Sequence, residues 1–131
     1  MEQLCIFSRP DFDDTAVRWG QYWTGELIKK CPLGVVELYK EEARRAPTEA
    51  AIKAHPKAYY YLFGHGNSKC ATGQDLEIVI DEQNIELWKD SWVHLLSCEV
   101  FADLGKKFPH GSGYEKTYYF YISVYPNSVA E

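Results

Sequence analysis

Short apolar runs that alternate with helix-like segments constrain the fold of this 131-residue chain more than any other feature. Each run is bounded by turn residues, as buried strands are, and the runs cover residues 4–7, 35–39, 58–63 and 92–96. Strands that are joined by helical crossovers pair in parallel and carry helices on both faces. The pattern therefore predicts an α/β fold, a three-layer sandwich around a mainly parallel central sheet.

The segments between these runs carry the signals of helices. The first helix is expected to begin at a cap formed by Asp13, Asp14 or Thr15 and to end at residues 29–30, before a proline. The second is an alanine-rich segment over residues 48–54, which Pro47 opens. Weaker patterns predict a short strand over 76–80, a helical turn over 84–88, an amphipathic helix over 100–108 and a last strand over 117–125.

The composition limits what the protein can bind and where it works. A formal net charge of −5 argues against nucleic acid as a partner, because no cluster of Lys and Arg could neutralise a run of phosphates. The sequence holds no stretch of about 18 apolar residues for crossing a membrane, and the N-terminus lacks the pattern of a signal peptide. We therefore expect a single cytoplasmic domain over residues 1–131, whose four cysteines are free thiols.

Two reactive side chains follow two of the expected strands. His65 comes after the run at 58–63, within the sequence Phe-Gly-His-Gly-Asn, and Cys98 comes after the run at 92–96. The carboxyl ends of parallel strands meet at one edge of the sheet, where α/β proteins build their sites. An imidazole beside a thiol favours the nucleophilic thiolate, and the amides of Gly66 and Cys98 can face a developing oxyanion. This edge therefore predicts acyl-transfer chemistry, with His65 as the base and Cys98 as the nucleophile.

These two motifs resemble those of the caspase-like cysteine peptidases, a group that includes caspases, metacaspases, legumains, separases, gingipains and CHAT domains. The flanking sequences 61–67 and 95–98, followed by a Leu-Gly pair at 104–105, are similar to the gingipain and CHAT branch in particular. The resemblance implies a caspase-like fold over about residues 4–125. It also implies a dyad of His65 and Cys98, an oxyanion hole to which Gly66 contributes, and a peptide or protein substrate that is cleaved without a cofactor.

Acidic, histidine and cysteine residues also offer candidates for binding a substrate or a metal. No residue matches the family's pocket for the substrate side chain before the cut, but Asp75 and Asp81 are acidic candidates that would suit a basic side chain. A metal site built from His65, Cys70 and Cys98 lacks the close spacing of metal ligands, so no metal is expected.

A second interpretation remains open, in which the module keeps the fold but binds a protein partner or a second copy without catalysis. Val100 and Phe101 stand where many active members carry a glycine, and the family's peptidases continue with further strands beyond the point that corresponds to Glu131. The tyrosine-rich last strand, over 117–125, would then form the surface of a homodimer. A third and weaker interpretation is a flavodoxin-like protein that binds a small ligand at the same edge, although no glycine-rich phosphate loop follows the first strand.

Overall fold

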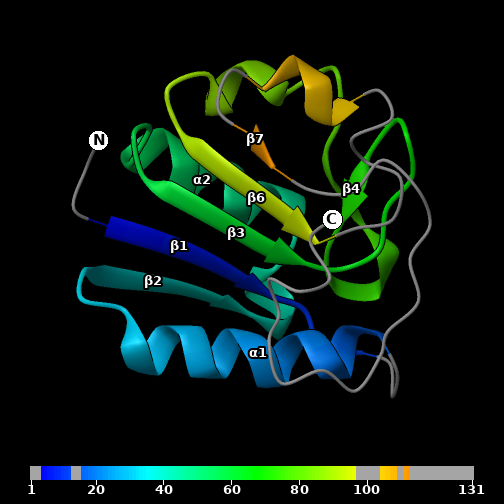
Figure 1. Cartoon of the computed structure of the whole chain (residues 1–131). Coiled ribbons are helices and arrows are strands. Elements are labelled where there is room, and N and C mark those ends of the chain that lie inside the picture. Colours follow the sequence, from blue (N-terminus) through cyan, green and yellow to red (C-terminus); the bar gives the residue numbers. More distant parts are fainter. Residues whose placement is uncertain (1–3, 13–15, 97–103, 109–110, 113–131) are drawn as a thin grey trace.

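The computed structural model describes residues 4–12, 16–96, 104–108 and 111–112. The strands of its central sheet are β1 (Leu4–Arg9), β2 (Gly34–Tyr39), β3 (Tyr59–Phe63), β6 (Trp92–Leu96) and β7 (Gly111–Ser112). They lie in the order β2-β1-β3-β6-β7, and every neighbouring pair is parallel. The arrowheads of β1, β2, β3 and β6 accordingly point the same way (Figure 1). The prediction of an α/β fold with a mainly parallel central sheet is confirmed.

Two helices lie on opposite faces of this sheet (Figure 1). Helix α1 (Ala16–Lys30) contacts β1 and β3, and its residue Leu27 lines the same cavity as Phe7 and Tyr61. Helix α2 (Arg45–Ala54) packs Ile52 into the core on the other face, beside Ile6. The side chains of each strand alternate between the two faces, so odd positions of β1 face α1 and even positions face α2. The arrangement is compatible with a three-layer sandwich.

Shorter elements fill the connections. Strands β4 (Ala71–Thr72) and β5 (Ile78–Ile80) form an antiparallel pair outside the main sheet. The remaining elements are 3₁₀ turns, namely η1 (Lys40–Glu42), η2 (Gln74–Leu76), η3 (Ile85–Trp88) and η5 (Leu104–Lys107). In the part of the chain that the structure describes, no helix has both the length and the apolar character that crossing a bilayer demands.

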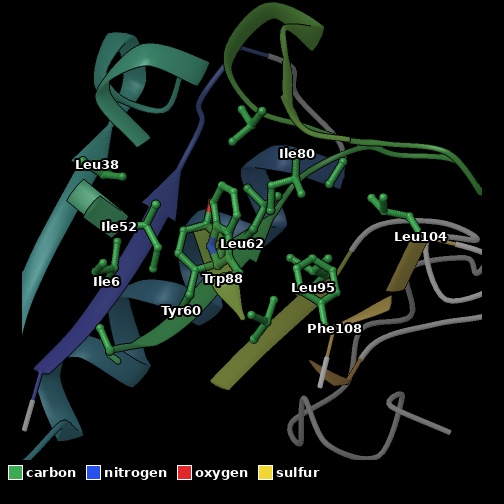
Figure 2. Packing of buried hydrophobic residues seen from close by; sticks show 14 residues of the cluster. Ile6, Leu38, Ile52, Tyr60, Leu62, Ile80, Trp88, Leu95, Leu104 and Phe108 are labelled. Carbon is green, nitrogen blue, oxygen red and sulfur yellow. The ribbon is translucent and has the colours of Figure 1, made fainter. Parts of the chain in front are cut away.

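A continuous hydrophobic core lies between the sheet and α2 (Figure 2). Tyr60 and Trp88 are fully buried there, and their rings meet edge to face with centroids 5.6 Å apart. The other buried members come from nearly every element and are Ile6, Leu38, Ile52, Ala58, Leu62, Ala71, Val79, Ile80, Val93, Leu95, Leu104 and Phe108. Because the even positions of β1 and β3 pair with one another in register, the sheet presents one apolar surface to α2.

Most predicted elements are confirmed, and the differences have physical reasons. The second helix begins at Arg45, so Pro47 lies inside its first turn, where the backbone N–H has no partner within the helix. The strand expected over 76–80 is shortened to β5 because Asp75 and Leu76 adopt left-handed backbone, with φ of 52° and 65°. Residues 104–107 form a 3₁₀ turn where the pattern predicts an amphipathic helix, and β7 was not predicted at all. The cap at 13–15, residues 100–103 of the expected amphipathic helix and the strand over 117–125 lie outside the described residues.

Candidate functional site at the carboxyl edge of the sheet

The carboxyl ends of β3 and β6 are where the sequence places both reactive side chains. These strands are direct neighbours in the sheet, and their last paired residues are Phe63 and Leu96. His65 follows Phe63 by two residues, and Cys98 follows Leu96 by two residues. Each reactive residue therefore stands two positions after the last paired residue of its strand, and the two strands are adjacent. Cys98 itself lies outside the described residues, so its distance from His65 stays a prediction.

The backbone of His65 is held against β4. The His65 carbonyl accepts one hydrogen bond from the backbone N–H of Thr72 and another from its hydroxyl, both at 2.8 Å. Gly64 makes this close return possible, because a Cβ at position 64 would lie 2.5 Å from the carbonyl oxygen of Thr72. Any side chain at this position would collide with backbone, so Gly64 sets the path by which the chain reaches His65.

The N–H of the next residue, Gly66, takes no part in the hydrogen bonds between this loop and β4. Gly66 and Ala71 form an antiparallel bridge, and the bonds that make it come from their neighbours. One runs to the carbonyl of His65, and the other runs from the N–H of Asn67 to the carbonyl of Cys70 at 3.0 Å. In such a pair the enclosed residues direct their own N–H groups away from each other's strand. The Gly66 N–H therefore points away from β4.

A segment that follows β1 lies next to the imidazole. The ring of Phe12 meets the ring of His65 edge to face, with centroids 6.0 Å apart. The buried side chain of Gln74 holds this segment, since it accepts a hydrogen bond from the N–H of Asp11 at 2.8 Å and donates one to the Asp11 carbonyl at 3.3 Å. The segments after β1, after β3 and after β4 thus converge at this edge.

The two acidic candidates are paired with arginines at the start of α2. Asp75 accepts a hydrogen bond from Arg44 at 2.6 Å, and Asp81 accepts two from Arg45, each at 3.0 Å. The hydrogen bonds from Arg45 hold the pKa of Asp81 below its usual range. These partners lie 31 and 36 positions away, so the run of mixed charges in the sequence could not reveal them. Their role as a pocket for a basic substrate side chain stays a prediction.

The histidine of β6, His94, belongs to an aromatic row on the α1 face. Phe7 and Tyr61 stack with centroids 4.9 Å apart, and the ring of His94 lies 6.1 Å from that of Tyr61. Burial lowers the pKa of His94, as expected for a histidine that packs in a sheet. His94 therefore packs within the sheet and lies apart from the candidate dyad.

Cys70 is buried, and burial raises the pKa of its thiol, so it is a poor candidate for a nucleophile. Within residues 4–12, 16–96, 104–108 and 111–112, no three His, Cys, Asp or Glu side chains gather as metal ligands would.

No protein-family model, curated protein or solved structure matches this chain. The resemblance to caspase-like peptidases therefore rests on the two motifs.

Proposed function

We propose that the carboxyl edge of β3 and β6 is the active site of a cysteine-dependent hydrolase, with peptides as its substrates. The observation that carries the proposal is the register of these strands, which pairs Phe63 with Leu96 and leaves His65 and Cys98 two residues beyond. Neighbouring strands lie about 4.8 Å apart, so side chains at equivalent positions beyond their ends are within reach of each other.

Each residue has a defined task in the proposed reaction. His65 accepts the proton of the Cys98 thiol, and the thiolate attacks the carbonyl carbon of the scissile peptide bond. The oxyanion accepts hydrogen bonds from the amides of Gly66 and Cys98, and the outward direction of the Gly66 N–H supports this role. His65 then protonates the leaving amine, and water, activated by His65, hydrolyses the acyl-enzyme.

Asp75 and Asp81 are proposed to attract a basic substrate side chain. Both carboxylates already pair with arginines of the chain, so a substrate cation would compete with them. A lysine or arginine of the substrate would have to share these carboxylates with Arg44 and Arg45, which already neutralise them. Replacement of Asp75 by Asn should therefore change the preference for basic peptides without changing the rate of Cys98 alkylation. Asp75 is the better choice for this test because it is more exposed than Asp81.

The reactivity of the thiols tests the dyad directly. In the unmodified chain treated with limiting iodoacetamide, the thiolate of Cys98 should be alkylated ahead of the half-buried Cys31. Cys5 and Cys70 should react last, because they are buried and burial raises the pKa of both thiols. Replacement of His65 by Ala should slow alkylation of Cys98 by roughly tenfold or more, because the thiolate loses its partner. Mass spectrometry of the digested protein would measure both. Equal labelling of all four cysteines would refute the dyad. So would an alkylation rate of Cys98 that is the same in the unmodified chain and in His65→Ala.

Turnover is tested with a peptide library. The unmodified chain and a Cys70→Ser control should cleave the same peptides, whereas Cys98→Ala and His65→Ala should not. Circular dichroism of each variant establishes that it is folded. A folded protein that cleaves no peptide would refute the peptidase and favour the alternative, a catalytically inactive module that binds a protein partner or a second copy of itself.

A further inference from the structure

Two thiols that the proposed reaction does not use lie against each other at the opposite end of the sheet. Cys5 is the second residue of β1, and Cys31 follows the last residue of α1. Their sulfur atoms are 3.5 Å apart, and both thiols are free. Cys5 pairs with Tyr59, the first residue of β3, whereas His65 lies beyond the last residue of that strand. About six residues of extended chain, roughly 20 Å, separate the two places.

A cavity lies beside the two cysteines. It has a volume of about 250 Å³, and Cys5 and Cys31 both line it. Its walls include the aromatic rings of Phe7 and Tyr61, and Lys30 contributes the only ammonium group among the lining residues. Hydrogen peroxide is far smaller than this volume, so the cavity can hold it beside the two cysteines.

The two thiols differ in a way that sets the order of reaction. Cys31 is half-buried and its sulfur lies 3.7 Å from the carbonyl oxygen of Leu33, which orients the thiol next to Cys5. Cys5 is buried, and burial together with the hydrogen bond from Cys31 raises the pKa of its thiol to about 12. The more accessible Cys31 therefore meets an oxidant first, and Cys5 is the partner that reacts second.

We propose that Cys5 and Cys31 are an oxidation site that closes into a reversible disulfide when the protein meets hydrogen peroxide. In the first step the sulfur of Cys31 takes one oxygen atom, the O–O bond of the peroxide breaks and water leaves, which gives a sulfenic acid. In the second step the sulfur of Cys5 attacks that sulfur, the S–S bond forms and the S–O bond breaks. The hydroxyl group leaves as a second water with the proton of Cys5.

The geometry and the consequence of this bond follow from the fold. An S–S bond is about 2.05 Å long, so the sulfur atoms must approach by about 1.5 Å, a displacement within reach of side-chain rotation. The bond would tie the end of α1 to β1 and close a loop over residues 5–31. A closed loop restricts the unfolded chain, so the oxidised protein should resist heat better than the reduced protein.

The test uses the full chain with Cys70→Ser and Cys98→Ser, in which only the proposed pair remains. Hydrogen peroxide at a low molar excess should remove both free thiols in each chain, and digestion should yield the peptide of Cys5 linked to that of Cys31. The thermal midpoint should rise by several degrees, and dithiothreitol should reverse both changes. This result is independent of catalysis by Cys98, because the assay measures no turnover.

Single substitutions supply the controls. With Cys5→Ser, peroxide should leave a sulfenic acid at Cys31 that dimedone traps, whereas with Cys31→Ser the thiol of Cys5 should stay unreacted over the same time. The proposal is overturned if both thiols of the paired protein stay free under conditions that oxidise exposed cysteine in a peptide. It is equally overturned if Cys31 proceeds to sulfinic acid without a link to Cys5, or links two chains together.

Discussion

At the scale of single residues, the absence of a side chain at Gly64 determines how the backbone of the candidate site is arranged. The carbonyl oxygen of Thr72 occupies the space that a Cβ would need, and the same Thr72 holds the backbone of His65. A collision with backbone cannot be relieved by turning a side chain, so the whole loop would have to move. Glycine is required at this position by the close approach of β4 and not by an unusual φ.

Replacement of Gly64 by Ala should therefore destabilise the protein by about 2 kcal/mol or more and displace His65. The matched control is Gly25→Ala in the interior of α1, where the nearest atom to a new Cβ is the flexible end of Arg9, at 3.6 Å. That substitution should stabilise the helix by about 0.5–1 kcal/mol, because alanine loses less backbone freedom on folding. Urea unfolding measures both, and equal effects of the two substitutions would contradict the argument from Thr72.

At the scale of elements, charged side chains join the start of α2 to the segment around β5. The carboxylate of Glu77 accepts the backbone N–H of Arg45 at 2.7 Å and so supplies a partner that the beginning of a helix needs. The guanidinium of Arg45 also pairs with Asp81 through two hydrogen bonds, while Asn84 donates to the carbonyl of Val79 at 2.7 Å. The orientation of α2 thus depends on residues that come well after it in the chain.

The pair between Asp81 and Arg45 should make stability depend on pH. Because the pKa of Asp81 is lowered in the folded state, its stabilisation is present above the pKa of the unfolded chain, about 3.9, and is lost as the pH falls through the folded value. Asp81→Asn should cost about 1 kcal/mol at pH 7, and the cost should shrink as the pH falls below about 3.9. Urea unfolding at pH 7, 4 and 2.5 measures this difference. An undiminished cost at pH 2.5 would show that the charge of Asp81 is not what stabilises the protein. The control is Asp90→Asn, at an exposed position, which should change the stability little at any of these pH values.

At the scale of the whole molecule, the core unites elements that are far apart in the sequence. Its buried members extend from Ile6 in β1 to Phe108 after η5, and they form one cluster between the sheet and α2 (Figure 2). A core shared in this way predicts that these elements unfold together. Because the same cluster supports β3 and β6 from one face, it also supports the carboxyl edge on which the proposed site depends.

Leu62→Ala should test this cooperativity. Leu62 is fully buried in β3, so the cavity left behind should cost about 2–5 kcal/mol. Ile78→Ala is the control, since Ile78 is 43% exposed and its truncation should cost less than about 1 kcal/mol. Tryptophan fluorescence and far-ultraviolet circular dichroism should give the same urea midpoint for each protein. Separate midpoints would mean that the core is divided into independent parts.

Local patterns in the sequence were sufficient to predict the strands β1, β2, β3 and β6, both long helices and the parallel α/β class. Apolar runs, helix signals and turn residues depend on neighbours within a few positions, so they can be read without knowledge of the fold. The same patterns placed His65 and Cys98 just after two strands. They could not show that Asp75 and Leu76 shorten β5, since a left-handed backbone at these residues has no local signal here.

Contacts between distant segments were decided only by the tertiary structure. The adjacency of β3 and β6, the arginine partners of Asp75 and Asp81, and the contact between Cys5 and Cys31 all join residues at least 26 positions apart. Such pairs depend on strand order and on which face of the sheet each helix covers. Neither property can be predicted from a local stretch of sequence. The sequence could therefore name candidate residues, while the packing of the chain decided which strands are neighbours and brought Cys5 next to Cys31.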